Sequence, residues 1–235
     1  DLLPTLWFCN TWNWWPGIKP HLAAAKRTSG ASVITASHPD LGDRWLYCDG
    51  APALLFTEND TNAERLFDTP NPSPYVKDAF HAFLVEGNAA AVNSAQVGTK
   101  AAAHYRLEVG AGETVAVRLC LTDTPHATGP FAIFDKTIDA RRKEADEFYR
   151  ACTPDSACDD TAGVMRQAFG GLFWTKQYYF FDVNMWLREH GVHPLDAPAS
   201  VPIRNRSWFH MLNDDVISMP DKWEYPWYAA WDLAF

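Results

Sequence analysis

The residues best suited to chemistry lie together at the end of the sequence, between Pro220 and Phe235. Aromatic and acidic side chains are interspersed in this run: Asp221, Trp223, Glu224, Tyr225, Trp227, Tyr228, Trp231 and Asp232. Aromatic rings stack on the apolar C–H faces of sugars, and an ionised carboxylate accepts hydrogen bonds from two hydroxyl groups. The run therefore has the side chains that a pocket for a neutral sugar needs.

A buried core is the competing interpretation of the same run. Tryptophan is large and mostly buried in proteins, so tryptophan-rich segments are more often core than ligand platform. Against this, the neighbours of the aromatic residues are Asp221, Glu224 and Asp232, and unpaired buried acids are costly. The residues alone leave both interpretations open.

Composition narrows the class of partner. The 235 residues, 47% of them hydrophobic, suffice for one large domain or two modest ones. The formal charge of −9 argues against nucleic acid or an anionic membrane as partner. No apolar run approaches the length of a membrane span. The 11 Trp, 8 Tyr and 14 Phe are compatible with carbohydrate recognition, so the expected partner is a small sugar or glycoside.

The five cysteines are odd in number and lack metal-type spacing with histidine: Cys9, Cys48, Cys120, Cys152 and Cys158. We expect buried, reduced thiols in a cytoplasmic protein, with no metal and no cofactor. The alternative is a disulfide between Cys152 and Cys158. The chain starts at Asp1 without Met and stops within the aromatic run, so we expect a piece of a longer protein, from which a signal peptide could have been lost.

The pattern up to residue 132 is that of β-strands separated by turns. The expected strands are Thr5–Cys9, Ser32–Ala36, Trp45–Cys48, Ala53–Thr57, Ala79–Glu86, Ala102–Val109 and Thr114–Thr122. Residues 106–109 and 115–119 flank a Gly-Ala-Gly-Glu turn and are predicted to pair as a hairpin. Residues 22–26 and 88–95 fit neither period and are expected to be loops. Strands without intervening helices predict an antiparallel β-sandwich.

Helical periodicity begins after Phe134. Asp135 is a suitable cap for a helix over Lys136–Ala151, whose strongly charged exposed side is typical of a solvated face. Asp159 or Asp160 is expected to cap a second helix of about 31 residues, with an apolar stripe from Val164 to Trp186. Its flank carries Trp174, Lys176, Gln177, Tyr178 and Asp182, of which Trp174 and Tyr178 are expected at the edge of the core.

Two glycine features accompany this second helix. Gly191 suits its C-terminal cap, and Gly170-Gly171 would allow a close neighbour. Residues 192–219 are rich in proline and polar residues and are expected to form a structured loop.

Several segments resemble bacterial glycoside hydrolase family 63, in its branch similar to mannosylglycerate hydrolases and α-glucosidases. They cover most of the chain, and the last is the most specific: residues 3–8, 97–105, 162–186, 204–210 and 218–235. The resemblance implies a β-sandwich followed by an (α/α)6 toroid, which this chain truncates. The expected domains are residues 1–132 (β-sandwich), 133–158 (linker helix and loop) and 159–235 (first part of the toroid).

The family also implies a reaction. Two carboxylic acids hydrolyse an α-glucosidic or related α-glycosidic bond with inversion, standing roughly 6.5–9.5 Å apart. One acid protonates the leaving oxygen, and the other activates a water molecule. The general acid needs a raised pKa, which an aromatic, poorly hydrated pocket supplies.

The resemblance also bears on the role of Asp232. In this family and the related trehalases, an aspartate at the end of such an aromatic run binds sugar hydroxyl groups, and the catalytic acids come from later loops. Asp232 lies about forty residues after the end of the predicted helix and matches this sugar-binding aspartate. The expected substrate-binding residues are Trp223, Glu224, Tyr225, Trp227, Trp231 and Asp232, and neither catalytic acid is expected in this chain. The alternative role of Asp232 is general acid.

Ala229 departs from the trehalase pattern, which has an aromatic residue at this position. The resemblance therefore does not fix which residues line the pocket. The competing function is a non-catalytic carbohydrate-binding β-sandwich module. A third reading is a purely structural β-sandwich with a helical tail. The sugar, the linkage and the oligomeric state do not follow from the sequence.

Overall fold

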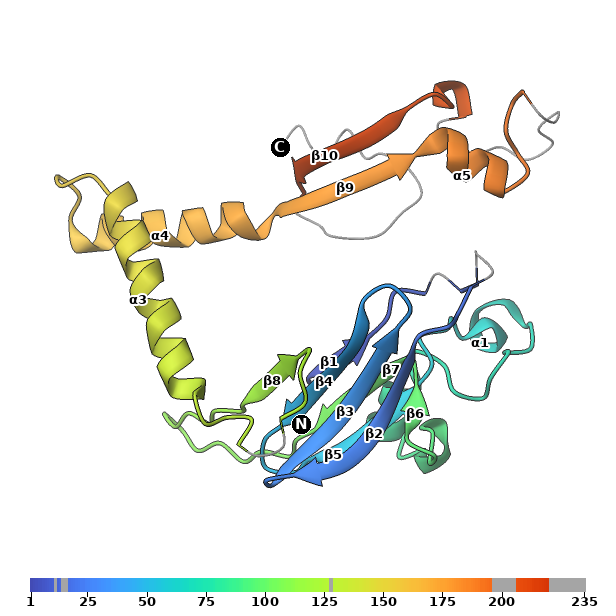
Figure 1. Cartoon of the computed structure of the whole chain (residues 1–235), viewed down its shortest axis with the longest axis horizontal. Coiled ribbons are helices and arrows are strands. Elements are labelled where there is room, and N and C mark those ends of the chain that lie inside the picture. Colours follow the sequence, from blue (N-terminus) through green and yellow to red (C-terminus); the bar gives the residue numbers. More distant parts are fainter. Residues whose placement is uncertain (11, 14–16, 127–128, 196–205, 220–235) are drawn as a thin grey trace. The chain divides into compact units, whose positions relative to one another are not determined.

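The computed structural model describes residues 1–10, 12–13, 17–126, 129–195 and 206–219 (Figure 1). The chain divides into two compact units, Asp1–Arg141 (unit 1) and Arg142–Phe235 (unit 2). The described part combines antiparallel sheets with helices, so the mixed β and α class expected from the sequence is confirmed at that level. The domain limits at 132 and 158 stay predictions.

Unit 1 contains most of the strands and two short α-helices. Its elements are β1 (Thr5–Trp7), β2 (His21–Thr28), β3 (Ala31–His38), β4 (Gly42–Cys48), β5 (Ala53–Thr57), α1 (Ala63–Phe67), α2 (Ala79–Val85), η1 (Ala89–Ala91), β6 (Val97–Gly98), β7 (Lys100–His104) and β8 (Leu119–Thr122). The first sheet has the order β6-β2-β3-β4-β8 and the second β1-β7-β5, and all the paired strands are antiparallel.

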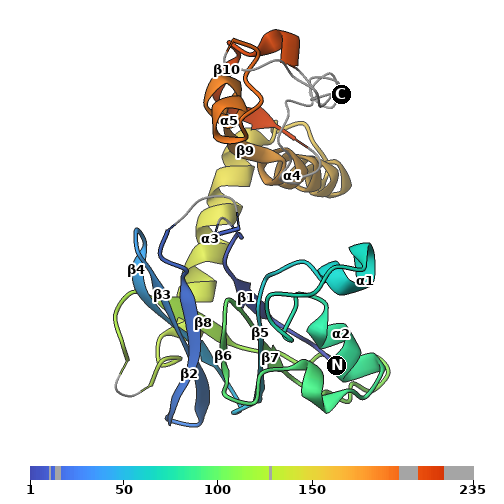
Figure 2. The ribbon, with the colours of Figure 1, turned by 90° about the vertical axis from the view of Figure 1, so that its right-hand side faces the viewer.

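The main core of unit 1 is shared by the two sheets, which appear as separate layers in Figure 2. Leu22, Ile34 and Leu46 come from the first sheet, and Phe56 and Ala101 from the second. Strand side chains alternate between the two faces, so every second residue of these strands can enter a core shared by facing sheets. On the other face of the second sheet, Phe80 of α2 packs with Leu55 and Ala102.

Four expectations for unit 1 are wrong. Residues 79–86 form α2 because Ala79, Phe80 and Phe83 share a helical face that covers the second sheet. The predicted loop at residues 22–26 lies in β2, whose small alanines fit beside β3. The loop at 88–95 contains the short helix η1.

The predicted hairpin is the fourth. Its turn forms, with the Glu113 N–H donating to the Gly110 carbonyl oxygen at 3.1 Å. Its arms do not pair: residues 106–109 and 115–118 lie in no strand. The chain enters a strand only at Leu119–Thr122, which pair with β4 and bring Leu119 and Cys120 against two hydrophobic clusters.

Unit 2 begins within a helix. Its elements are α3 (Phe134–Cys152), which starts in unit 1, α4 (Asp159–Trp174), β9 (Lys176–Asp182), α5 (Val183–Glu189), η2 (Arg206–Trp208) and β10 (Leu212–Ser218). The predicted helix over 136–151 is confirmed as α3, but the helix starts at Phe134, so Asp135 lies in its first turn and is not its cap. The Arg166 guanidinium lies 2.6 Å from Asp146 and 4.8 Å from the centre of the Tyr149 ring, and these contacts join α4 to α3.

The prediction of one long helix from 159 to about 190, capped by Asp159 or Asp160, is wrong: Cys158 is the N-cap, and both aspartates lie in the first turn. α4 ends at Trp174, and the run Lys-Gln-Tyr-Tyr-Phe-Phe-Asp forms β9, which pairs with β10. Aromatic residues favour strands, and the partner strand supplies hydrogen bonds that a helix would have made internally. The expected loop over 192–219 is wrong for the same reason, because residues 212–218 are that partner.

Two glycine predictions have different outcomes. Gly191 follows α5 with a φ of +66°, and its N–H donates to the Arg188 carbonyl oxygen at 3.0 Å, so its capping role is confirmed. At Gly171, a Cβ would meet no described atom within 4 Å, and at Gly170 it would make an ordinary contact with the Tyr149 hydroxyl at 3.9 Å. The predicted close neighbour is therefore absent from the described part of the chain.

Candidate functional site

All the predicted sugar-binding residues lie outside the described residues: Trp223, Glu224, Tyr225, Trp227, Trp231 and Asp232. The last described residue before them is Met219, which is 1% exposed. Its N–H donates to the Thr175 carbonyl oxygen at 2.8 Å, directly after β10. The β9–β10 pair therefore holds the residue from which the chain continues into the candidate run.

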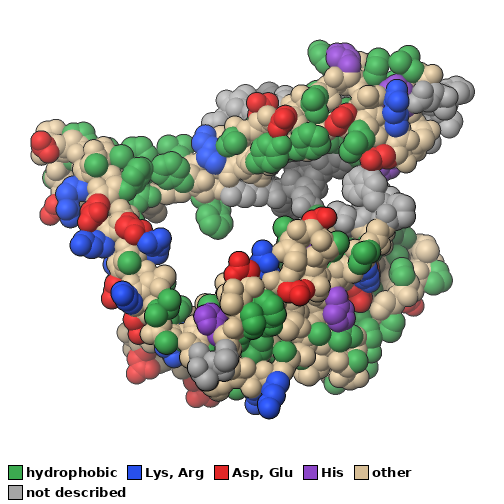
Figure 3. Space-filling model, in the orientation of Figure 1, with side chains coloured by type: hydrophobic (Ala, Val, Ile, Leu, Met, Phe, Trp, Pro, Cys, Tyr) green, Lys and Arg blue, Asp and Glu red, His purple; other side chains and the backbone are tan. Residues whose placement is uncertain are grey.

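One face of the β9–β10 pair carries exposed aromatic, aliphatic and charged side chains. We call it the aromatic–acid face, formed by Lys176, Tyr178, Phe180, Leu212, Asp214 and Val216. Alternation along β9 puts Tyr178 and Phe180 on the same side, and the strand register pairs them with Val216 and Asp214. Tyr178 is 64% exposed and Phe180 is 52% exposed. Figure 3 shows hydrophobic side chains along the surface of α4 and β9.

Tyr178 and Asp214 are joined directly. The phenolic hydroxyl donates to Oδ1 of Asp214 at 2.6 Å. This hydrogen bond, followed by partial burial and the charges of Asp214 and Asp215, raises the pKa of Tyr178 above its usual value. At neutral pH the pair combines a protonated phenol with a carboxylate beside an exposed ring, and such a group can stack on a sugar and bind its hydroxyls.

Of the five flanking residues expected on one helix, Trp174 ends α4 and the other four lie on β9. Lys176 and Tyr178 lie on the aromatic–acid face, whereas Gln177 points to the opposite, more covered face. Asp182 caps α5, accepting a hydrogen bond from the Met185 N–H at 2.9 Å. Trp174 is 76% exposed, so the expectation that Trp174 and Tyr178 line the edge of the core is wrong for the described chain.

Asp214 is the residue of this face that the sequence analysis missed. The Asn213-Asp214-Asp215 run suggested a loop, because such residues are typical of turns. The useful signal was Val216-Ile217 directly after it, which suits a strand. Only the pairing of β9 with β10 brings Asp214 to Tyr178, across 36 positions of sequence.

Unit 1 contains a separate polar hollow of about 580 Å³ beside α1 and α2. Asn62, Arg65, Asn71 and Asp78 line it. The Asn62 amide donates to both Asp78 oxygens at 3.2 Å, and the Arg65 guanidinium lies 3.1 Å from one of them. An array of amide, guanidinium and carboxylate groups can bind hydroxyl-rich molecules.

A second polar group in unit 1 is organised by Asp60, whose side chain is 6% exposed. Its Oδ1 accepts hydrogen bonds from Asn10, Trp12 and Asn13 at 2.6, 2.9 and 3.3 Å. The Lys19 ammonium lies 3.8 Å from Oδ2. These contacts tie the segment after β1 to the segment after β5, and we assign them a structural role.

The cysteines differ partly from expectation. All five lie in the described part of the chain, and none of them forms a disulfide. Cys48 alone of the five is buried, Cys120 is half-buried, and Cys9, Cys152 and Cys158 are exposed. The expectation of buried thiols therefore holds for Cys48 and is wrong for the three exposed ones.

Within the described ranges, no group of three or more His, Cys, Asp and Glu side chains is arranged to hold a metal ion. The helices of the described segments are too short or too polar to cross a membrane.

Comparison with known proteins gives one similarity and two negative results. The chain is 43% identical over 196 residues to the uncharacterized protein YMR196W of Saccharomyces cerevisiae. The match covers 78% of this chain and 18% of the yeast protein, so the chain spans less than a fifth of that relative. No family model matches, and no solved structure matches.

Proposed function

We propose that this chain is part of an inverting glycoside hydrolase of the family 63 type, acting on α-glucosides or related α-glycosides. Unit 2 supplies one wall of the sugar pocket, and the general acid and base come from a later part of a longer polypeptide. The observation that carries the proposal is the Tyr178–Asp214 hydrogen bond on an exposed aromatic face, because Asp214 lies on β10, the last strand before the Trp- and Asp-rich run in the sequence.

The finer architecture belongs to the same proposal. Unit 1 is interpreted as the β-sandwich domain, and this is supported by the core shared between its two sheets. Residues 159–235 are interpreted as the beginning of the toroid, after the linker helix α3. Support comes from α4, which has 16 residues and no buried side chain, because such a helix needs further partners. The strand β9 is a local departure from a purely helical toroid.

In the proposed mechanism the residues of this chain bind and orient the substrate. Aromatic rings of the candidate run and of β9 stack on the sugar, and Asp232 accepts hydrogen bonds from its hydroxyl groups. This chain would neither protonate the leaving oxygen nor activate the water molecule. The chain by itself should therefore be inactive. The proposal places the enzyme in the cytoplasm.

The test uses a longer polypeptide that contains this chain, incubated with α-linked glucosides. The expected result is hydrolysis whose first product has the β configuration, as detected by proton NMR before mutarotation. A first product of α configuration would contradict the inverting mechanism. Absence of hydrolysis across a panel of α-glycosides would contradict the enzyme class.

A non-catalytic carbohydrate-binding module is the second candidate, and the polar hollow of unit 1 favours it. Its test is calorimetric titration of unit 1 with α-linked oligosaccharides, comparing the wild type with Asp78→Asn. Binding that the substitution weakens, together with an inactive longer polypeptide, would replace the hydrolase proposal. A purely structural role would show neither binding nor turnover.

A further inference from the structure

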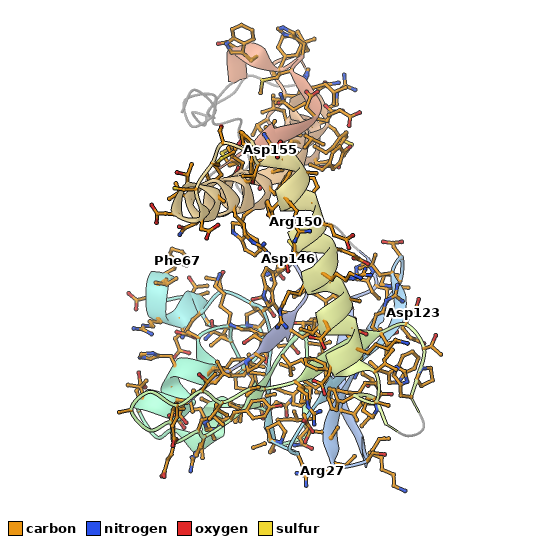
Figure 4. The ribbon with its side chains drawn as sticks, turned by 90° about the vertical axis from the view of Figure 1, so that its left-hand side faces the viewer. Arg27, Phe67, Asp123, Asp146, Arg150 and Asp155 are labelled. Atoms are coloured by element: carbon orange, nitrogen blue, oxygen red, sulfur yellow. The ribbon has the colours of Figure 1, made fainter. Side chains whose placement is uncertain are left out.

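Two exposed cysteines flank the connection between α3 and α4. Cys152 is the last residue of α3, and Cys158 is the N-cap residue of α4. The connection folds as a turn, in which the Ala157 N–H donates to the Pro154 carbonyl oxygen at 2.9 Å. Asp155, labelled in Figure 4, lies in this turn. Cys158 follows Cys152 by six positions in the sequence.

Packing between α3 and α4 keeps both thiols at the same end of the helix pair. The Arg166–Asp146 ion pair of 2.6 Å joins the two helices. The Phe148 and Phe173 rings lie 5.8 Å apart, centre to centre. These contacts lie on the helices themselves, so a bond between the two thiols has to be closed across the connection, residues 153–157.

Cys158 is placed to react. Its sulfur lies 3.3 Å from the Thr161 hydroxyl oxygen. The hydrogen bond with this hydroxyl, followed by that with the Thr161 backbone amide, lowers the pKa of the Cys158 thiol. The thiolate is the nucleophilic form of cysteine, so an exposed thiol with this neighbour reacts faster than an ordinary one.

We propose that Cys158 is a site of thiol–disulfide exchange and that Cys152 resolves the adduct. The Cys158 thiolate attacks a low-molecular-weight disulfide, forming a mixed disulfide and releasing one thiolate of the reagent. Cys152, after losing its proton to solvent, attacks the Cys158 sulfur. A Cys152–Cys158 disulfide forms and the second reagent thiolate leaves, so two cysteines are oxidised and one reagent disulfide is reduced.

The charges around the connection predict which reagents react best. Asp155, Asp159 and Asp160 are close to Cys158 in sequence, and Asp159 and Asp160 form the first turn of α4. Negative charges repel an anionic reagent and attract a cationic one. At low salt, cystamine should therefore react faster than the neutral 2-hydroxyethyl disulfide, and anionic glutathione disulfide should react most slowly.

The test treats the reduced chain with 2-hydroxyethyl disulfide and locates the products by peptide mass spectrometry. In the wild type the expected product is a Cys152–Cys158 disulfide, with the loss of two hydrogens. Cys152→Ser should accumulate a mixed disulfide at Cys158, whereas Cys158→Ser should form no internal disulfide. Cys9→Ser is the matched exposed-cysteine control, and it should react like the wild type.

A second variant separates reactivity from exposure. Thr161→Val removes the hydroxyl beside the sulfur and should slow the reaction of Cys158 severalfold, whereas Thr161→Ser should keep the wild-type rate. Preferential modification of Cys9, or a mixed disulfide at Cys158 that persists in the wild type, would overturn the proposal. Equal rates for the two Thr161 variants would also overturn it. Circular dichroism of each variant checks that it is folded.

Discussion

The Tyr178 hydroxyl donates a 2.6 Å hydrogen bond to Oδ1 of Asp214, across the two strands of unit 2. The two residues come from segments for which the sequence predicts a helix and a loop. Their contact puts a phenol, a carboxylate and an exposed ring at one point of the aromatic–acid face. The hydrogen bond is also the main reason for the raised pKa of Tyr178.

Replacing Asp214 should change the titration of Tyr178. With Asp214→Asn we expect the pKa of Tyr178 to fall toward its usual value, because the carboxylate that favours the protonated phenol is gone. The measurement is the ultraviolet absorbance of phenolate against pH, with Tyr178→Phe subtracted to isolate this residue. Asp215→Asn is the control and should shift the pKa less, because only its charge acts on Tyr178.

The raised pKa of Tyr178 also makes the stability of the protein depend on pH. A folded-state pKa raised above the unfolded value contributes stability that is fully present below the unfolded pKa, about 10 for tyrosine. That contribution is lost as the pH rises through the folded-state pKa.

An identical Tyr178 titration in the wild type and in Asp214→Asn would contradict the hydrogen bond between Tyr178 and Asp214.

Gly98 should not tolerate a side chain. A Cβ at this position would overlap with the Thr57 carbonyl oxygen and lie 2.9 Å from the Thr57 carbonyl carbon, and backbone atoms cannot move aside as a flexible side chain does. We expect Gly98→Ala to destabilise the protein by about 3 kcal/mol, measured by urea denaturation.

The control for this prediction is Gly163→Ala in α4. A Cβ at Gly163 meets no described atom within 4 Å, and alanine favours helices over glycine. We expect a gain of about 0.5–1 kcal/mol in the stability of unit 2. If both alanine variants were equally stable, the close approach of Gly98 to Thr57 would be wrong.

The sequence predicts structure well where one local pattern determines the result. The α3 helix follows from an acidic residue at its start and from helical spacing, and Gly191 ends α5 as its position predicts. The strand pattern identifies β3, β4 and β5 because each is a short, largely apolar run bounded by turn-forming residues.

Local sequence patterns do not predict which distant segments pair as strands. The run 176–182 has apolar residues at helical spacing as well as aromatic residues suited to a strand. Its partner β10 decides between the two, and that partner comes 30 or more residues later. The error at residues 79–86 is the reverse: the sequence predicts a strand and the structure has helix α2. The apolar face of a short amphipathic helix resembles the alternation of a strand.

Asp60 should be a major stabilising residue of unit 1. Its side chain is nearly buried and accepts three side-chain hydrogen bonds. Asp60→Asn removes the charge that strengthens these hydrogen bonds and puts an NH2 group in the place of Oδ2, opposite the Lys19 ammonium, so we expect a loss of about 2 kcal/mol, measured by chemical denaturation. The exposed Asp40→Asn is the matched control and should change stability by less than about 0.5 kcal/mol. A similar effect of both substitutions would refute the structural role of Asp60.

Unit 1 should lose stability in alkaline solution. Burial raises the pKa of the Cys48 thiol from 9.0 to about 11. Burial, followed by the Cys48 and Asp49 charges, also raises the pKa of Tyr105, whose hydroxyl donates to the Asp49 carbonyl oxygen at 2.8 Å. Both groups contribute stability that is present at neutral pH and is lost as the pH rises from about 9 toward 11 and above.

The measurement is the free energy of unfolding between neutral pH and pH of about 11. Cys48→Ala should lower stability at neutral pH through lost packing, and it should weaken the decline at alkaline pH. Cys120→Ala, at a half-buried position of the neighbouring strand, should leave the alkaline decline unchanged. If the wild type and Cys48→Ala declined in parallel, the buried thiol would not be the source of the effect.

The candidate site was the part least accessible from sequence. Its residue types were evident in the aromatic run, because sugar stacking and hydroxyl binding need aromatic rings and acids. Asp214 was not evident, because its role depends on a strand register that fixes which side chains lie opposite one another. The polar hollow of unit 1 was missed as well, since its asparagines and acids come from turns and short helices between strands.

The central claim is that unit 2 and the run after it form one wall of a sugar pocket in an α-glycosidase. Its most direct test is kcat/KM for an α-linked glucoside, measured on a longer polypeptide before and after Asp232→Asn. Loss of a charged hydrogen bond to the sugar predicts a fall of roughly 10- to 100-fold with an unchanged circular dichroism spectrum. An unchanged kcat/KM for Asp232→Asn and for Trp231→Ala would contradict the claim.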